Sequence, residues 1–339
     1  MASMDIFNNS AFSMTSLTTA VNKKPYKPQL LGSLGIFTPK PSRTRDIWVE
    51  RKNGRLHIVP TSDVGAPATK RVADKRDGTS FRTVRIAPGS RVSAEEVQGI
   101  RAFGSESELK SVATEVSDRM DDLLSDLELT EEHHRLGAIN GVLLDADGTT
   151  VIEDFYDRFG IAKPGAVDFA FSTEATEVRN VIKGITRAMH RSAKGALPEG
   201  AQIHALCGDE FYDALTTHPT VEKFYLNYLA AQQHQQGTGI FGVFYFEGVY
   251  WHNYRGTDDN ATVAVPSGEA RFFPVGGRDV FQKAMAPAEF APYVNTRGLP
   301  RYAMVIPDRD RQAYVDVEVY SYPLFMCTRP EVLRSATAS

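Results

Sequence analysis

The sequence predicts an α+β fold, and three features indicate it. A basic β-hairpin pattern covers residues 46–86, a long amphipathic helix pattern follows at residues 106–132, and aromatic strand patterns dominate after residue 240. The chain has 339 residues, 42% of them hydrophobic. It can therefore bury a sizeable core, and it suits roughly two domains on a prior of about 150 residues each.

Composition narrows the functional classes. The net charge of −4 fits neither a polybasic nucleic-acid binder nor a strongly acidic, disordered chain. Cys207 and Cys327 lie far apart, which fits a reducing cytoplasm and argues against a disulfide framework or a zinc ribbon. The first 28 residues do not resemble a signal peptide, and no uncharged apolar stretch approaches the roughly 18 residues of a membrane helix. We therefore expect a protein that is made and kept in the cytosol.

Residues 1–45 are predicted to form an extended N-terminal arm. They are rich in Ser, Thr, Asn and Lys, and Pro25, Pro28 and Pro41 disfavour helix in the residues before them. An apolar segment inside the arm is expected to bury itself on a neighbouring subunit. Its candidate contact residues are Leu30, Leu31, Leu34, Ile36 and Phe37.

A basic hairpin is predicted next. Strand patterns at 47–49 and 56–59 flank the turn signal Asn53-Gly54, and a third strand pattern covers 81–86. Residues 61–78 contain hardly any large apolar side chain, so they should project into solvent. Residues 43–91 hold twelve Lys or Arg against five Asp or Glu.

The long helix carries the opposite charge. Residues 106–132 contain ten acids and two bases, and apolar residues at spacings of three and four form one face. Opposite charges that cannot cancel locally suggest a head-to-tail contact between subunits. The candidate contact residues are Lys70, Arg71, Lys75 and Arg76 on the hairpin and Asp118, Asp121, Asp122 and Asp126 on the helix.

The remaining elements follow from periodicity. A β pattern covers residues 142–159, and a second helix is predicted at 176–192, with Ser172 or Thr173 as its cap and Gly195 as its stop. A strand at 203–207 and helices at 210–215 and 221–233 form an α/β unit. Further strands are predicted at 241–254, 270–275 and 314–322.

One motif is typical of an enzyme. Residues 141–149 place Asp145 and Asp147 directly after an apolar strand, where haloacid-dehalogenase-type phosphatases hold a nucleophile and an acid/base group beside Mg²⁺. Phe169–Ser172, Lys183 or Lys194, and the Gly208–Asp213 segment could supply the other motifs. However, 64 positions between Asp145 and Asp209 are too few for the intervening βα units. A hairpin turn explains the motif better, because Asp and Gly tolerate turn conformations.

Three weaker motifs favour structural roles. The G-x-G-x-x-G at 237–242 lacks a preceding strand and a following helix, so we predict a flexible loop. Glu131 and His134 form a single E-x-x-H, which predicts a solvated helix face rather than a di-iron site. Cys207 lies two residues from Asp209, which opposes thiolate formation, so a buried structural thiol is expected.

Four blocks near the carboxyl end occur in an order that resembles the lambda-type (E-family) major capsid proteins of tailed phages. The blocks are the glycine-flanked aromatic strands at 242–256, P-S-G-E-A-R at 266–271 with F-P-V-G at 273–276, A-P-A at 286–288 with N-T-x-G at 295–298, and S-x-P-L at 321–324 with R-P-x-x-L at 329–333. The looser amino-terminal match consists mainly of D-I-x-V-E at 46–50 and the basic hairpin.

The resemblance implies the Hong Kong 97-like fold and a structural role. It assigns residues 1–45 to the arm, 46–92 to an E-loop, 93–200 to a peripheral domain with a spine helix, 201–300 to an axial domain, and 301–339 to a return into the peripheral domain with a C-terminal tail. It implies self-assembly into the hexamers and pentamers of an icosahedral head, in the virion, with assembly in the host cytoplasm. Scaffold and portal proteins would be partners, decoration proteins are a further candidate, and the shell would enclose double-stranded DNA without sequence-specific binding.

The resemblance implies no catalytic, cofactor-binding or metal-binding residue, no cofactor and no membrane partner. Two alternatives stay open from the sequence. One is an encapsulin-like nanocompartment shell of the same fold, and the other is the phosphatase.

Overall fold

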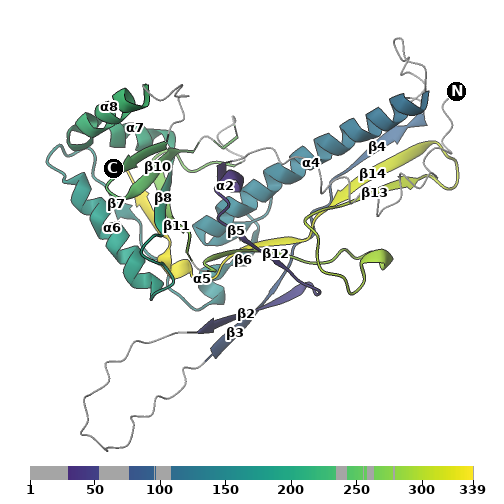
Figure 1. Cartoon of the computed structure of the whole chain (residues 1–339), viewed down its shortest axis with the longest axis horizontal. Helices are drawn as coiled ribbons and strands as arrows, with labels where there is room; N and C mark the ends of the chain where they lie inside the picture. Colours follow the sequence, from purple (N-terminus) through teal and green to yellow (C-terminus); the bar gives the residue numbers. More distant parts are fainter. Residues whose placement is uncertain are drawn as a thin grey trace, which may run out of the picture. The chain divides into compact units, whose positions relative to one another are not determined.

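The computed structural model describes residues 30–52, 76–94, 96, 108–233, 243–254, 256–257, 263–277 and 279–338 (Figure 1). Contacts within the chain divide these residues into two compact units. The first unit holds the described residues up to Ile47, then Arg82–Arg135 and Gln282–Met326. The second holds the described residues of Trp48–Phe81 and Leu136–Phe281 and those from Cys327 onward. Both units combine sheet with helix, which confirms the predicted α+β class.

A long helix packed on a three-stranded sheet forms the core of the first unit. Helix α4 (Glu108–Asn140) lies along a sheet in which β14 (Tyr314–Tyr320) pairs antiparallel with β13 (Tyr302–Pro307) and β4 (Gly89–Ser93). The spacing of three and four along α4 places its apolar side chains on one face. The buried residues that meet there are Val92, Val116, Met120, Leu123, Leu124, Leu127, Ala303, Val315, Val317 and Val319.

A second small sheet of the first unit joins segments that are distant in the sequence. Strand β1 (Thr38–Pro41) pairs in parallel with β12 (Phe281–Met285), which neighbours β15 (Pro323–Cys327). A short helix α2 (Leu30–Ser33) precedes β1, and the 3-10 helix η3 (Ala291–Tyr293) follows β12. Around η3 lies an aromatic cluster of Tyr293, Tyr302, Tyr320 and Tyr322 over Ala286 and Ala288.

The second unit is built on a six-stranded sheet with the order β7, β16, β11, β8, β10, β9. Their bounds are β7 Val167–Asp168, β8 Gln202–Cys207, β9 Val243–Phe246, β10 Val249–Asn253, β11 Glu269–Val275 and β16 Arg334–Thr337. Strand β8 pairs in parallel with β10 and antiparallel with β11, so the sheet is mixed.

Helices cover one face of this sheet (Figure 1). They are α6 (Val178–Ala193), α7 (Asp209–Thr217) and α8 (Pro219–Gln233). Because side chains alternate along a strand, Ile203, Ala205 and Cys207 of β8 all face the helices. The core there is aromatic, with Trp251 stacked 6.4 Å from Phe211 and edge-on to Phe272 at 5.4 Å between ring centroids.

The opposite face of the sheet carries a pair of buried histidines. Nδ1 of His204 lies 2.8 Å from Nε2 of His252, and the two rings are stacked. Tyr250 stacks on His204 with ring centroids 4.7 Å apart, and Phe273 packs beside it. A hydrogen bond between two imidazoles needs one neutral acceptor, so this arrangement tolerates at most one added proton.

Two hairpin-like pairs complete the second unit. Strands β5 (Val142–Leu144) and β6 (Val151–Asp154) pair antiparallel and lead into α5 (Phe155–Arg158). Strands β2 (Asp46–Lys52) and β3 (Arg76–Arg82) form a two-stranded ribbon, and the 3-10 helix η4 (Pro330–Val332) precedes β16. The ribbon is fixed by Phe81, which is fully buried against Phe155 and Phe159.

The structure differs from the sequence predictions in three places. The arm is not wholly extended, because α2 forms within it. The second helix begins after Glu177, so the predicted cap at Ser172 or Thr173 is wrong. Residues 155–158, at the end of the β pattern predicted at 142–159, form the helix α5. The domain boundaries stay predictions.

We predict that the histidine pair makes the second unit less stable in acid. Burial lowers the pKa of His204 to about 4, and burial together with the charge of His204 lowers the pKa of His252 to about 4. Both values lie below the usual 6.5, so the unfolded chain binds more protons between pH 6.5 and 4. The free energy of unfolding should therefore decrease as pH falls through this window, by roughly 3 kcal/mol for one histidine.

Urea denaturation at several pH values between 7.5 and 4 measures this loss. His252→Gln keeps a hydrogen-bonding partner for His204 and should make the pH dependence shallower. His190→Gln is the control, because His190 is exposed on α6 and should leave the dependence unchanged. An equal pH dependence in the parent and in the His252→Gln protein would contradict the assignment.

Candidate functional site

A group of buried charges lies where α4 approaches β12 in the first unit. Glu131 is 1% exposed, and its carboxylate receives Lys283 Nζ at 2.7 Å and Arg135 Nη2 at 2.9 Å. The three side chains come from the last turns of α4 and from β12. A buried carboxylate needs such partners, because an unpaired charge in the interior costs several kcal/mol.

Two more acids of α4 join the same group. Glu132 accepts from Arg135 Nη1 at 3.1 Å and from the backbone N–H of Leu31 at 2.8 Å. Glu128 accepts from Arg301 Nη1 at 3.1 Å. We call these six side chains the buried charge network: Glu128, Glu131, Glu132, Arg135, Lys283 and Arg301.

An aromatic ring lies beside the network. The Arg135 guanidinium and the Lys283 ammonium stand 5.0 Å and 4.9 Å from the centroid of the Phe325 ring. The ring of Phe37 meets Phe325 edge-on at 5.1 Å. Cations favour the face of an aromatic ring, and the preference is stronger where water is excluded.

Glu131 is held in its charged form. Burial is the largest single influence and raises the pKa of Glu131. Lys283 and Arg135 together lower it by more than burial raises it, so the pKa lies below the usual value. Burial lowers the pKa of Lys283, which Glu131 partly offsets. The predicted solvated face at Glu131 and His134 is therefore wrong, since both side chains are buried.

A second ion cluster is partly exposed. Arg45 and Arg85 both donate to Glu289 at 3.1 Å. Their guanidinium groups lie over Tyr322 and Tyr320, at 4.9 Å and 5.1 Å from the ring centroids. Three separate segments of the first unit are thereby tied together at its surface.

The predicted acidic contact residues lie on the open face of α4. Asp118, Asp121, Asp122 and Asp126 are all exposed, opposite the buried Leu124 stripe. The basic partners predicted for them, Lys70, Arg71 and Lys75 and the side chain of Arg76, lie outside the described residues. The contact between these two groups of residues stays a prediction.

The apolar residues of the arm lie largely within their own unit. Leu31 is 1% exposed, and Leu30, Leu34, Ile36 and Phe37 are half-buried. The Leu31 amide binds Glu132, and Phe37 packs on Phe325. The intramolecular contacts were not predicted from the sequence, and the contact with a neighbouring subunit stays a prediction.

The phosphatase-like motif is a hairpin turn. Asp145 and Asp147 lie between the antiparallel strands β5 and β6, where the amide of Gly148 donates to the Asp145 carbonyl at 2.9 Å. The Asp147 carboxylate accepts from the Thr150 hydroxyl and from the amides of Thr149 and Thr150, and these bonds hold its pKa well below the usual range. Both acids therefore serve the turn, and they do not stand at the end of a parallel strand as the phosphatase chemistry requires.

The other chemical motifs that lie within the described residues also have structural roles. Cys207 is fully buried, and burial raises the pKa of its thiol, as expected for a structural residue. Asp209 begins α7, whose first turn is held by Ser267: its carbonyl accepts from the Phe211 amide, and its hydroxyl accepts from the Glu210 amide. The glycine-rich segment 237–242 lies outside the described residues.

The described residues hold neither a metal-ligand cluster nor a membrane-spanning helix. That part of the chain contains no cluster of three or more His, Cys, Asp or Glu that could hold a metal ion. In the same residues, every helix is too short or too polar to cross a membrane.

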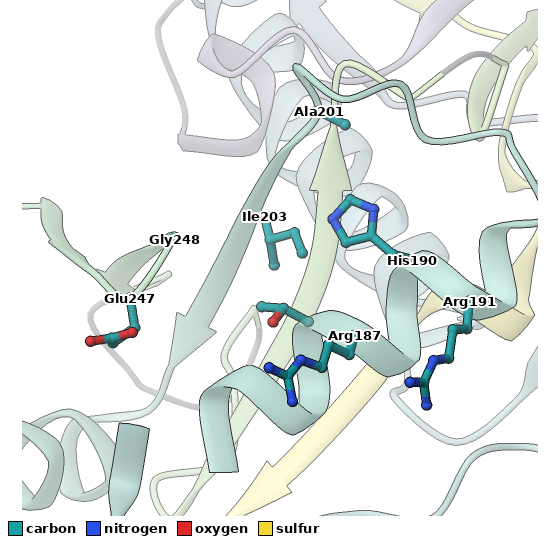
Figure 2. Close-up of a pocket in the computed structure, with 8 residues that line it drawn as sticks. Arg187, His190, Arg191, Ala201, Ile203, Glu247 and Gly248 are labelled. Atoms are coloured by element: carbon teal, nitrogen blue, oxygen red, sulfur yellow. The ribbon is translucent and has the colours of Figure 1, made fainter. Parts of the chain in front are cut away.

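A shallow depression of about 450 Å³ lies beside α6 in the second unit (Figure 2). Its lining comes from α6, from the start of β8 and from the turn between β9 and β10. Figure 2 shows Arg187 and Arg191 projecting from α6 in the same direction, whereas His190 points toward the strand that carries Ile203. Glu247, on the turn, binds Arg179 at 3.1 Å and Lys183 at 3.4 Å.

The sequence blocks near the carboxyl end mark close approaches of the backbone. In the block 295–298, Asn295 adopts a left-handed conformation with φ of 61°. Gly298 donates to Ser42, and a Cβ at this position would lie 2.2 Å from the Met285 carbonyl oxygen. In the block 321–324, the Ser321 hydroxyl donates to the Pro300 carbonyl, and the Pro323 carbonyl accepts from Val84. The close approach at position 298 requires glycine, and the hydroxyl of Ser321 serves a structural hydrogen bond.

We predict that Lys283→Met destabilises the protein strongly. The substitution keeps the apolar contact with Phe325 but removes the principal partner of a buried carboxylate, which should cost about 3–5 kcal/mol. Denaturant titration measures the loss, and adding Glu131→Gln should recover part of it. The control is Arg91→Ala, which breaks an exposed pair with Asp316 and should have a small effect. A Lys283→Met protein as stable as the Arg91→Ala protein would overturn this description.

The sequence matches known capsid proteins over nearly its whole length. The family model described as phage major capsid protein E matches residues 13–338. The "Major capsid protein" of Salmonella phage Felix O1 (isolate Felix O1-VT1) is 25% identical, covering 96% of this chain and 95% of the relative. The "Major capsid protein" of Pseudomonas phage KPP10 is 26% identical, covering 88% and 89%.

Solved structures share the fold at low sequence identity. A candidate capsid protein of an Escherichia coli CFT073 prophage is similar with a TM-score of 0.57 and 12% identity, covering 99% of this chain and 97% of that one. The capsid of an empty GTA particle gives a TM-score of 0.54 at 10% identity, covering 93% and 92%. The capsid of Myoviridae phage XM1 gives 0.50 at 12% identity, covering 94% and 95%. With a family model matched from residue 13 to residue 338, the chain belongs to the phage major capsid protein E family.

Proposed function

We propose that this chain is the shell-forming subunit of a tailed-phage head, assembling into hexamers and pentamers that enclose double-stranded DNA. The observation that carries the proposal is the match to the capsid family along almost the entire chain. The matches to the two relatives named as major capsid proteins cover 95% and 89% of those proteins, so the likeness is not confined to one domain. The proposal gives the chain no catalytic step, and it includes scaffold, portal and decoration proteins as further partners.

An exposed tryptophan on the β2–β3 ribbon supports a contact between subunits. Trp48 is 64% exposed, and its indole lies against Gly78 of β3, where a Cβ would come within 2.1 Å of the ring. A two-stranded ribbon is marginally stable without a partner, and tryptophan is enriched among the residues that dominate interfaces. We therefore place Trp48 in a contact with a neighbouring copy.

The opposite charges of two segments support a second contact. The open face of α4 presents Asp118, Asp121, Asp122 and Asp126, while the segment between β2 and β3 is rich in Lys and Arg. We propose that this basic segment of one copy meets the acidic face of the next. Such a contact is heterologous, and a heterologous contact closes into rings when its rotation allows.

We predict that the purified protein forms closed shells or rings in negative-stain microscopy and that Trp48→Ala reduces their yield severalfold. The loss follows from removing a large apolar anchor from the interface. Trp48→Phe retains an aromatic ring and should assemble nearly as the parent does. A parent protein that stays monomeric would refute the shell function, and full assembly by Trp48→Ala would refute the contact.

We also predict that reversing Lys70, Arg71, Lys75 and Arg76 to Glu leaves a folded subunit that does not assemble. Like charges across an interface cost several kcal/mol, whereas single exposed pairs contribute only about 0–1 kcal/mol, so several residues must change together. Reversing Asp118, Asp121, Asp122 and Asp126 to Lys in the same chain should restore part of the assembly.

Sedimentation at low and high salt measures both effects. Salt should weaken them, because exposed charges are screened within about 10 Å at 0.1 M. Normal assembly of the four-site reversal, or a lack of rescue in the eight-site protein, would show that this contact is wrong.

A further inference from the structure

One face of α6 is basic throughout its second half. The helix buries Val178, Ile182, Ile185 and Met189, and residues 178–193 include no Asp or Glu. Arg187, His190, Arg191 and the helix-ending Lys194 stand on the opposite face, and all four are exposed. We call these four residues the α6 basic ridge. Within the described part of the chain, none of the four forms an ion pair with a carboxylate within 4.0 Å.

The ridge is bounded by a carboxylate at one end. Glu247 already binds Arg179 and Lys183, so the charges of the first half of the helix are partly neutralised. Beyond Lys183 the positive charges of Arg187, Arg191 and Lys194 remain. The helix dipole stabilises cations in the last turn, which gives Arg191 and Lys194 a role in the stability of the helix. This effect falls off within one turn and does not reach Arg187. Helix stability alone therefore does not explain the ridge.

The spacing of the ridge suits a line of phosphates. Arg187 and Arg191 are one turn apart, about 6 Å along the axis, and they project in the same direction (Figure 2). From Arg187 to Lys194 the ridge spans about 10 Å. A DNA duplex carries one negative charge per about 1.7 Å of its axis, so several phosphates lie within that reach.

The side-chain chemistry of the ridge favours a polyanion over a protein partner. Protein interfaces have an apolar centre from which charged residues are depleted. The ridge offers no exposed apolar anchor, and Ile203, the large apolar residue lining the adjacent depression, is only 3% exposed. Protein–DNA interfaces, by contrast, are polar and strongly positive, and arginine is well suited to phosphate.

We propose that the α6 basic ridge binds the phosphate backbone of double-stranded DNA without reading its sequence. The proposal rests on the proposed function, since a head enclosing DNA supplies the duplex at high concentration. Beyond that function, the proposal identifies the face of the second unit that contacts the DNA. Arg187 and Arg191 make the principal contacts, and Lys194 extends them by one further phosphate.

The test is the salt dependence of binding to a short, mixed-sequence duplex, measured by fluorescence anisotropy with the full-length, unassembled protein. The logarithm of the binding constant should fall linearly with the logarithm of salt concentration, with a slope of about −3 for three phosphate contacts. Arg187→Gln with Arg191→Gln should reduce the steepness by about 2 and weaken binding at 0.1 M salt by roughly tenfold or more.

The chain offers a matched control for net charge. Arg309 and Arg311 are exposed between β13 and β14 and are flanked by Asp308 and Asp310. Arg309→Gln with Arg311→Gln removes the same charge and should leave the slope unchanged. An unchanged slope in the ridge variant, or an equal decrease in the control, would overturn the proposal.

Assembly is scored in parallel by sedimentation and negative stain. The ridge variant should form shells like the parent. If it fails to assemble and keeps its salt slope, the ridge is a protein interface and the DNA proposal is wrong. A parent that binds DNA with the expected slope but forms no shells would refute the proposed function and leave the ridge assignment standing.

Discussion

Glu131 sits almost wholly buried near the end of α4, and its carboxylate must find positive partners because water cannot reach it. Lys283 reaches it from β12, and Arg135 reaches it from the next turn of the same helix. These requirements fix the position of β12 against α4 to within hydrogen-bonding distance. Since β12 also pairs with β1, and Glu132 binds the Leu31 amide, the same constraint positions the amino-terminal residues of the first unit.

Buried ion pairs of this kind select an arrangement more than they stabilise it. Their Coulomb energy is largely offset by desolvation, so replacing a whole group with apolar residues is often neutral. Removing one member is costly, because the others stay buried and unpaired. An apolar contact at Phe325 would tolerate sliding, whereas the carboxylates of Glu131 and Glu132 accept donors in few positions. We infer that the network sets the register of α4 on its neighbours within the first unit.

Much of the fold could be predicted from periodicity, and the errors have identifiable causes. The apolar stripe of α4, the α/β unit after residue 200 and the Asp145–Gly148 turn follow from side-chain spacing and turn chemistry, and the structure confirms them. The buried acids were missed because acids are normally solvated. A signal was present, since Leu124, Glu128, Glu131 and Arg135 continue one stripe at spacings of four, three and four. The partners Lys283 and Arg301 are over 150 residues away in sequence, beyond any local pattern.

Charge is used in different ways at different depths in this chain. On α4, the acids in phase with the apolar stripe are neutralised inside the unit, whereas Asp118, Asp122 and Asp126 face outward. On α6, Arg179 and Lys183 bind Glu247, whereas Arg187 and Arg191 form no ion pair with a carboxylate in the described part of the chain. In both helices the inward or locally paired charges fix the fold, and the outward charges remain open to solvent. Outward charge adds little to the stability of a single subunit, because solvent screens it. Its use lies in contacts with other molecules. Because the acidic face lies on α4 and the basic ridge lies on α6, the contact proposed with a neighbouring copy and the contact proposed with DNA use different surfaces.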